Sequence, residues 1–260
     1  MKLYKYPRTH HIEGSRLQPG DEDLDSVSFR QIKGRSILVE EKLDGANSGI
    51  SFDNTGKQFL QSRGHFLDGG AREKQFGLLK TWASARQQKL YEILGDRYVM
   101  YGEWLYAKHT IFYDALPHYF FEFDLLDIHN GEFLSTSRRH DLLKNSPIVS
   151  VPVLWQGEAK SLEHLQSLLA HSLYKSKQWR ENLTATCDEH HQYFEMVNKQ
   201  TDISDLAEGL YVKVEENGRV VERYKFVRAG FLQAVSDSGS HWMDRPILPN
   251  QLRDDCDIFA

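Results

Sequence analysis

The stretch Lys42-Leu43-Asp44-Gly45-Ala46-Asn47 follows the apolar run Ser36-Ile37-Leu38-Val39, so it predicts a strand that runs out into a tight turn. A glycine at the fourth position of that stretch lets the backbone approach a phosphate group, because no Cβ stands in the way. The lysine that opens the turn is then placed to meet a phosphorus atom. Lysine amines act as covalent nucleophiles when burial or nearby cations lower their pKa, and we expect neighbouring cations to keep Lys42 partly neutral.

Short strands and helices follow one another in a pattern typical of an α+β fold with antiparallel sheets and flanking helices. The strand-like runs cover residues 36–41, 48–53, 58–62, 98–104, 119–126, 209–215 and 220–227. Two of the connections, at 53–56 and 217–218, have the composition of hairpin turns. Helical spacing of apolar residues covers 73–94, 137–143 and 160–200. Neither the Walker phosphate loop nor the glycine motif of dinucleotide-binding folds occurs in the chain.

This pattern divides the chain into three parts. Residues 1–35 form a polar N-terminal segment, and residues 36–235 form the main domain, with a helical insert at about 160–200. Residues 236–260 form an acidic tail, and we expect no separate C-terminal domain.

Composition limits the class of protein. The chain has 260 residues, of which 40% are hydrophobic, enough for one large domain. It has no run of 18 apolar residues and no signal peptide, so we expect no association with membranes. Its two cysteines have no metal-binding spacing, which fits a reducing cytoplasm.

The net charge of −5 argues against indiscriminate coating of nucleic acid. The charge is uneven, however. Residues 1–110 carry 17 Lys and Arg against 14 Asp and Glu, whereas residues 111–260 carry 15 against 23. A local basic face in the N-terminal part therefore stays possible.

Six short motifs then occur in the order typical of one enzyme superfamily. The lysine turn resembles motif I of the covalent nucleotidyltransferases, which comprise RNA ligases, DNA ligases and mRNA capping enzymes. The stretches that resemble motifs Ia, III, IIIa, IV and V are Ser62-Arg63-Gly64, Tyr101-Gly102-Glu103-Trp104, Phe121-Glu122-Phe123-Asp124, Glu208-Gly209-Leu210-Tyr211-Val212-Lys213 and Tyr224-Lys225-Phe226-Val227-Arg228. The resemblance covers residues 36–230 and implies the nucleotidyltransferase fold, the ATP-grasp-like fold of ligase adenylylation domains.

Within the superfamily the chain is similar to RNA ligases of the phage RNA ligase 2 type. Asn47 stands where DNA ligases and capping enzymes typically have arginine. The stretches Leu105–His109 and Tyr6–His11 also look like bacterial members of that group. Motif V departs from the group, because it pairs Lys225 with Arg228 rather than with a second lysine. The tail is too short for the group's usual C-terminal domain, and whether a partner protein takes the place of that domain stays open.

The resemblance implies an ATP-dependent RNA ligase that uses Mg²⁺, or Mn²⁺ in its place. Lys42 would take AMP from ATP and pass it to an RNA 5′-phosphate, and a 3′-hydroxyl would then displace AMP. The residues implied to bind the nucleotide or act in catalysis are Glu41, Lys42, Asn47, Arg63, Glu103, Phe121, Phe123, Glu208, Lys213, Lys225 and Arg228. The metal ligands would be Asp44, Glu103 and Glu208, because hard cations prefer oxygen. Arg8, His10 and Arg16 would contact the RNA.

Three alternatives stay open from the sequence. Phe121 and Phe123 lie two residues apart on one strand, and we expect one of them to stack on adenine and the other to belong to the core. Another covalent nucleotidyltransferase, either a DNA ligase or a capping enzyme that uses GTP, is the second enzyme hypothesis. A catalytically silent module that binds nucleic acid is the hypothesis from a different class.

Overall fold

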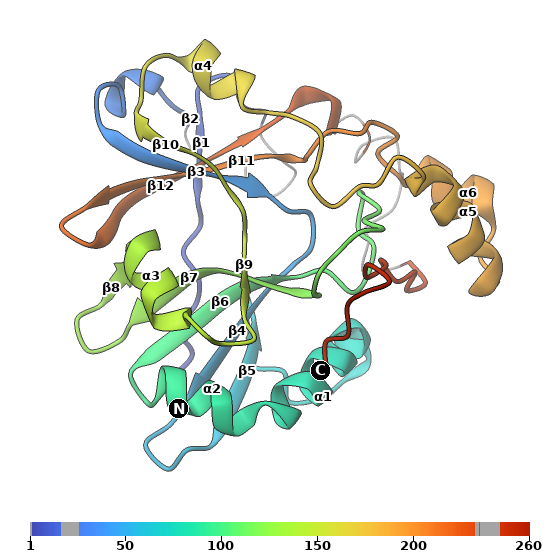
Figure 1. Cartoon of the computed structure of the whole chain (residues 1–260), viewed down its shortest axis with the longest axis horizontal. Coiled ribbons are helices and arrows are strands. Elements are labelled where there is room, and N and C mark those ends of the chain that lie inside the picture. The colour runs from blue at the N-terminus through green and yellow to red at the C-terminus, as the bar shows by residue number, and fades with distance from the viewer. Residues whose placement is uncertain (1, 17–25, 232–233, 235–244) are drawn as a thin grey trace.

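The computed structural model describes residues 2–16, 26–231, 234 and 245–260 of the chain. Its strands join into one 12-stranded sheet (Figure 1). Nine of them follow the order β10-β3-β11-β12-β8-β7-β6-β4-β5, and the other three, β1, β2 and β9, pair at its side. The strands are β1 (His10–Ile12), β2 (Ser26–Val27), β3 (Ser36–Lys42), β4 (Ala46–Phe52), β5 (Gln58–Ser62), β6 (Tyr98–Trp104), β7 (Phe120–Asp127), β8 (Glu132–Leu134), β9 (Val149–Ser150), β10 (Val153–Glu158), β11 (Gly209–Glu216) and β12 (Arg219–Val227).

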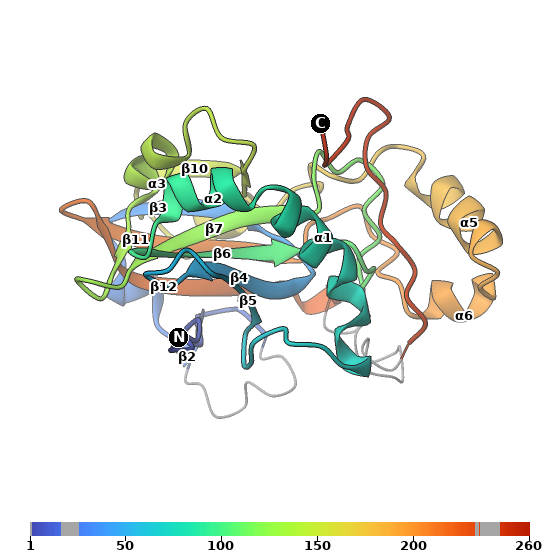
Figure 2. The same ribbon diagram turned by 90° about the horizontal axis from the view of Figure 1, so that it is seen from below.

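The helices are short and lie around this sheet. They are η1 (Phe29–Gln31), η2 (Ala71–Phe76), α1 (Gly77–Ala85), α2 (Gln87–Leu94), α3 (Thr136–Leu143), α4 (Leu162–Ser167), α5 (Trp179–Glu189) and α6 (Phe194–Lys199). Helices α1 and α2 cover one side of the β4–β7 strands, and α5 and α6 stand together at one end of the molecule (Figures 1 and 2). None of the helices in the described part of the chain has the length and apolar composition to span a lipid bilayer.

The sheet consists of two halves, each with an apolar core on one face. In the half formed by β10, β3, β11 and β12, alternate residues such as Val39, Val212 and Phe226 pack together with Ile12 from β1. In the half formed by β7, β6, β4 and β5, residues such as Trp104 pack with α1 and α2. The opposite face of the first half carries charged side chains such as Glu40 and Lys213, and that of the second half carries a small aromatic cluster that includes Tyr6 and Tyr101. The halves are joined through β8, which pairs with both β12 and β7.

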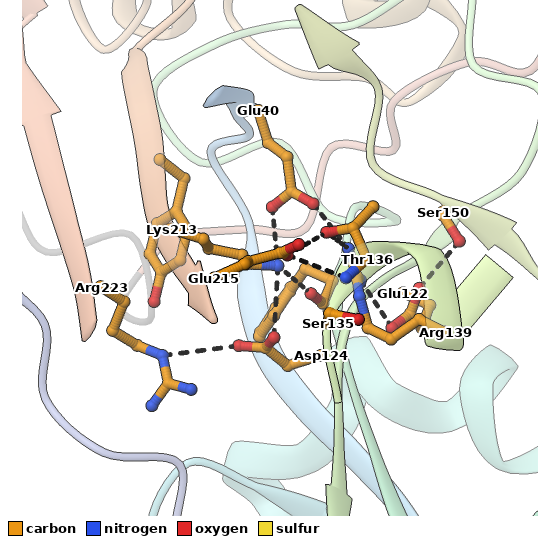
Figure 3. A network of polar contacts seen from close by, with 12 residues as sticks. Glu40, Glu122, Asp124, Ser135, Thr136, Arg139, Ser150, Lys213, Glu215 and Arg223 are labelled. Atoms are coloured by element: carbon orange, nitrogen blue, oxygen red, sulfur yellow. Dashed lines mark hydrogen bonds and ion pairs between the residues drawn. The ribbon is translucent and has the colours of Figure 1, made fainter. Parts of the chain in front are cut away.

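A buried ion network connects the two halves (Figure 3). Lys213 of β11 places its Nζ 2.9 Å from Glu40 Oε2 on β3 and 3.2 Å from Asp124 Oδ1 on β7. Arg139 of α3 reaches Glu40 Oε1 and Glu122 Oε1, each at 2.7 Å. All five side chains are 0% exposed. The network therefore fixes three strands and one helix relative to one another.

Further polar groups complete the network. Arg223 Nε lies 3.7 Å from Asp124 Oδ2, and the Tyr6 hydroxyl donates to the same oxygen at 2.5 Å. The Ser150 hydroxyl donates to Glu122 Oε2 at 2.8 Å. Three acidic and three basic side chains thus balance, which offsets much of the cost of removing these charges from water.

The structure confirms the α+β prediction and the antiparallel hairpins. Asp53 Oδ1 accepts hydrogen bonds from the backbone N–H groups of Thr55 and Lys57, which closes the first predicted turn. Asn217 and Gly218 both have positive φ, 52° and 77°, as a two-residue hairpin turn of this kind requires.

One prediction about a segment needs correction. The helical stretch at 160–200 is broken between α4 and α5, because carboxylates from elsewhere bind its serines: Ser172 Oγ donates to Glu41 and the Ser176 N–H donates to Asp114. The polar N-terminal segment 1–35 contributes β1, β2 and η1 in its described part. Of the predicted acidic tail, residues 236–244 lie outside the described part, and residues 245–260 pack on the domain, with Leu248 and Ile258 buried.

Loss of one cation from the ion network should destabilise the fold strongly. Arg139→Met is expected to lower the free energy of unfolding by about 3–5 kcal/mol, because buried carboxylates lose their partner. The control is Arg219→Met on β12, whose guanidinium is 46% exposed beside Glu132 and whose loss should cost under about 1 kcal/mol. Urea denaturation followed by circular dichroism measures both variants. Equal losses would show that the network does not hold the halves together.

Candidate active site

The lysine of the predicted turn lies against a buried glutamate where two strands meet. Lys42 is the last residue of β3, and Glu208 directly precedes β11. Lys42 Nζ lies 2.6 Å from Glu208 Oε1, and the two side chains are 21% and 2% exposed. Gly209 stands opposite Lys42 in the ladder, and a Cβ there would lie 1.9 Å from the Phe226 carbonyl oxygen. Only glycine therefore lets β11 and β12 pair closely beside Lys42.

The turn after Lys42 is held by hydrogen bonds from two parts of the chain. Asp44 Oδ2 accepts the backbone N–H groups of Thr110 and Ile111, both at 2.7 Å, and the Asp44 N–H donates to the Tyr113 hydroxyl at 2.8 Å. The Gly45 N–H donates to Glu103 Oε1 at 3.1 Å. The turn is thus fixed to β6 and to the loop that follows it, and the sequence pattern gave no sign of Tyr113's part in this.

Glycine at position 45 is required by close packing. A Cβ at Gly45 would lie 2.5 Å from Leu105 Cδ2 and 2.7 Å from the Trp104 carbonyl oxygen. Backbone from β6 therefore lies directly behind the turn, and any larger residue would push the turn away from it.

Electrostatics at the site differ from the sequence-based expectation. Burial would lower the pKa of Lys42, but the carboxylates of Glu208 and Glu103 outweigh it and raise that pKa above its ordinary value. Burial raises the pKa of Glu103 to about 8, although Lys42 opposes the shift, and burial also raises the pKa of Glu208. The expectation that neighbouring cations keep Lys42 neutral is therefore wrong for this state, because acidic groups lie closest to it.

Asn47 and Arg63 lie on the side of Glu103. Asn47 of β4 is the direct cross-strand partner of Glu103 on β6. Its Oδ1 is buried and has no hydrogen-bond partner in the part of the chain that the structure describes. Arg63 is exposed and close enough to lower the pKa of Glu103 against the effect of burial. Asn47 Oδ1 is therefore an oxygen that a nucleotide donor or a hard cation would satisfy.

The two basic residues of motif V have different positions. Lys225 of β12 pairs with Tyr211 in the ladder and is close enough to oppose the raised pKa of Glu208. Arg228 donates from Nε to the Ala207 carbonyl at 2.7 Å and forms an ion pair with Asp202. Arg228 thus fixes the segment that leads to Glu208, which is a supporting position rather than the predicted nucleotide contact.

Lys213 and Glu41 do not join the cluster around Lys42. Lys213 is 0% exposed, with its ammonium on Glu40, Asp124 and the Phe123 carbonyl, so the structure does not place it with Lys42, and its role as a catalytic cation stays a prediction. It lies four ladder positions from Lys42, roughly 13 Å along the strand. Glu41 points to the opposite face of β3 from Lys42, where Ser172 Oγ donates to its Oε1 at 2.5 Å. The structure therefore does not place Glu41 with the predicted nucleotide contacts.

The two phenylalanines of motif IIIa separate as core and groove residues. Phe121 is 0% exposed and packs in the core with its ring centroid 4.9 Å from that of Tyr174. Phe123 is partly exposed and lies on the polar side, with ring contacts to Tyr6 and Tyr211. Phe123 is thus the aromatic ring that a base could reach.

The predicted RNA contacts Arg8, His10 and Arg16 all have exposed side chains. Their segment lies beside motif V, because β1 pairs in parallel with β12 and sets His11 opposite Lys225. The Ser15 hydroxyl binds His11 Nδ1 at 2.7 Å and accepts the Val227 N–H at 2.9 Å. The N-terminal segment is therefore part of the site's wall.

The acidic groups do not form a complete metal site by themselves. Within the described residues, no three His, Cys, Asp or Glu side chains gather closely enough to hold a metal ion. Asp44 has Oδ2 committed to the backbone, whereas its Oδ1 faces His109 Nδ1 at 4.0 Å. Glu103, Glu208 and Asn47 Oδ1 are hard oxygen donors, so they suit Mg²⁺ or Mn²⁺ whose shell is completed by phosphate oxygens.

The pKa of Lys42 should fall when its nearest carboxylate is neutralised. In Glu208→Gln, burial acts with less opposition, so the pH midpoint for reaction of Lys42 with an amine-reactive reagent should move down. Peptide mass spectrometry measures this midpoint. The control is Asp53→Asn, which removes a carboxylate from the turn that joins β4 to β5 and should leave the midpoint unchanged. An unchanged midpoint in Glu208→Gln would contradict the assigned pair.

Comparison with known proteins places this geometry in a family. A family model described as RNA ligase matches residues 35–227. The fold is similar to structures of Naegleria gruberi RNA ligase: a variant with ATP and Mn is 19% identical, covering 80% of this chain and 54% of that chain, with a TM-score of 0.52. The same protein with PPi is 19% identical, covering 90% and 58%, with a TM-score of 0.55.

This chain therefore spans a little over half the length of those structures' chains, and their likeness concerns the fold. No curated protein sequence shows significant similarity to it. The family model, however, spans every strand of the site from β3 to β12. On that match, the chain belongs to the RNA ligase family.

Proposed function

We propose that this chain is an ATP-dependent RNA ligase with the covalent nucleotidyltransferase fold. Lys42 Nζ attacks the α-phosphorus of ATP, a P–N bond forms and pyrophosphate leaves. The AMP group then passes to the 5′-phosphate of an RNA strand, which restores the free amine. A 3′-hydroxyl finally attacks that phosphate, so that a phosphodiester forms and AMP leaves.

The pairing of Lys42 with Glu208 beside Glu103 is the observation that carries this proposal. A nucleophilic amine must be neutral, yet Glu208 at 2.6 Å favours the charged form of Lys42. Engagement of Glu208 and Glu103 by a divalent cation would withdraw that stabilisation and lower the pKa of Lys42. When bound, Mg²⁺ or Mn²⁺ would also stabilise negative charge on the phosphates. The same two carboxylates would thus keep Lys42 protonated in the free protein and would allow its deprotonation when substrate binds.

Other residues of the site would bind the nucleotide. Lys225 faces Glu208 from β12 and is the cation we assign to the phosphate. Phe123 is the ring we assign to stacking on the adenine, and Asn47 would bind the ribose or the metal's shell. Structures of the Naegleria gruberi RNA ligase with ATP and Mn, and with PPi, support ATP and a divalent cation as the cofactors.

The choice of RNA rests on the family and on Asn47. The alternative nucleotidyltransferases, DNA ligases and capping enzymes, typically have arginine at that position. A silent binding module would have no use for Lys42, Glu208 and Lys225 together in one groove. The family match and the site therefore both favour RNA ligation.

Covalent labelling tests the first step. Incubation with α-³²P-labelled ATP and Mg²⁺ should give an acid-labile protein adduct on a denaturing gel, because protonation breaks a phosphoramidate bond. Lys42→Ala and Lys42→Arg should both abolish it, since a guanidinium stays protonated and cannot attack. Glu103→Ala and Glu208→Ala should lose most of it. The control is Lys89→Ala, an exposed lysine of α2, which should label fully.

Two results would count against this assignment. Full labelling of Lys42→Ala would show that another residue is the nucleophile. Preferential labelling by GTP rather than ATP would assign the chain to the capping enzymes.

Sealing of nicked duplexes tests the choice of nucleic acid. Two substrates should be compared that differ only in ribose or deoxyribose at the nucleotide carrying the 3′-hydroxyl. We expect faster sealing with ribose, because the 2′-hydroxyl is the group by which a protein tells the two sugars apart. Equal rates would contradict the prediction of RNA specificity but would leave the ligase assignment intact.

A further inference from the structure

A cavity whose lining is largely apolar, with two cations at one wall, lies beside the Asp44 turn and outside the six sequence motifs. Its volume is about 230 Å³, and its walls come from the loop after β6, from α6 and the turn before it, and from the C-terminal segment. Its walls include Lys108, Gln192, Tyr193, Met196, Gln200 and Arg245. We call it the insert pocket, because α6 belongs to the helical insert at one end of the molecule (Figures 1 and 2).

Two cations converge at one wall of the insert pocket. Lys108 Nζ donates to the carbonyl oxygens of His109 and Gln200 at 3.2 and 3.0 Å. Arg245 donates to the same two oxygens at 3.2 and 3.5 Å. Lys108 is 9% exposed, and within the described residues no carboxylate lies within ion-pair distance of it. This wall therefore offers positive charge to an anion.

The electrostatic setting of Lys108 agrees with this geometry. Burial, together with the nearby Arg245, lowers the pKa of Lys108 to about 7, and Asp44 opposes the shift. A bound anion would favour the charged form and raise that pKa. The influence of Asp44 on both Lys108 and Arg245 also shows that the pocket lies close to the catalytic turn.

The rim of the pocket is apolar and exposed. Tyr193 is 70% exposed and Met196 is 54% exposed, which is unusual for side chains of this size. The side chains of Gln192 and Gln200 also line the pocket. Cations and an exposed aromatic ring in one pocket suit a phosphate with an unstacked base, because single-stranded RNA is bound by stacking on aromatic side chains.

We propose that the insert pocket binds one phosphate and the adjoining base of a single-stranded RNA end, next to the Lys42 centre. The inference rests on the proposed function for the identity of the strand. The pocket is smaller than the usual cavity for a whole drug-sized ligand, about 300–1,000 Å³, so it would take part of one nucleotide. Phosphates of ATP share the same chemistry, and the experiment separates the two sources.

The test measures binding of a fluorescent, 5′-phosphorylated 12-nucleotide RNA by anisotropy, without ATP. Tyr193→Ala should weaken binding by at least about fivefold, through loss of a base stack. Its matched control is Tyr91→Ala, an exposed tyrosine on α2 that should bind as the native chain does. Lys108→Met should reduce the slope of log affinity against log salt by about 0.7, the value for one phosphate on a single strand.

Labelling of Lys42 with ATP is measured in parallel on every variant. Because Tyr193 is exposed, its variant should fold even if Lys108→Met does not. Lower RNA affinity with labelling unchanged within about twofold would support the pocket as an RNA site. Unchanged RNA affinity in Tyr193→Ala, or lost labelling with unchanged RNA affinity, would overturn it.

These measurements distinguish failure of the ligase assignment from failure of the proposed RNA site. If the native chain binds the RNA but does not label, the ligase assignment fails. Weaker RNA binding by Tyr193→Ala in that case would still support the pocket.

Discussion

The position of Lys42 depends on the buried ion network between the two halves of the sheet. Each half has its own large apolar core on one face, and a small aromatic cluster around Tyr6 and Tyr101 lies beside the charges on the other face. Lys213 and Arg139 join the two halves by binding carboxylates of β3 and β7. Glu40 of this network and Lys42 lie two residues apart on one strand, about 6.5 Å. The spacing of the halves is therefore set close to the place where the chemistry is proposed.

Strand β3 therefore carries two charged residues with different parts: Glu40 belongs to the ion network, and Lys42 is the proposed nucleophile. The ion network is balanced and closed to solvent, whereas the cluster of Lys42, Glu208 and Glu103 has more acid than base. A balanced network resists change because removal of any member leaves an unpaired buried charge. An acidic cluster instead favours the arrival of a cation. Under the proposed function, this excess of acid would favour binding of the divalent cation that accompanies ATP.

Sequence alone predicted those features that depend on neighbouring residues. The turn glycines, the two hairpins and the lysine–glycine spacing follow from local backbone geometry, and the structure places Lys42, Glu103, Glu208 and Lys225 near one another. Features that depend on distant residues were not predictable in this way. Motif order suggested a role for Lys213 with the nucleotide, but its partners come from β3 and β7, which no local pattern identifies.

The sequence also did not predict on which face of the sheet these side chains lie. Glu41 and Lys42 are adjacent in sequence, yet strand alternation sends them to opposite sides of β3. The break between α4 and α5 has the same origin, because carboxylates of distant segments bind Ser172 and Ser176 there. Helical periodicity records composition and cannot show such long-range hydrogen bonds.

The parallel pairing of β1 with β12 has a consequence for how the protein is made. His11 leaves the ribosome early, whereas its ladder partner Lys225 is synthesised more than two hundred residues later. Contacts of such sequence separation form late, because a long loop must close before they are gained. During translation, β1 is therefore made long before β12 is available to pair with it. The side of the site that contains Lys225 can therefore form only after β12 has emerged.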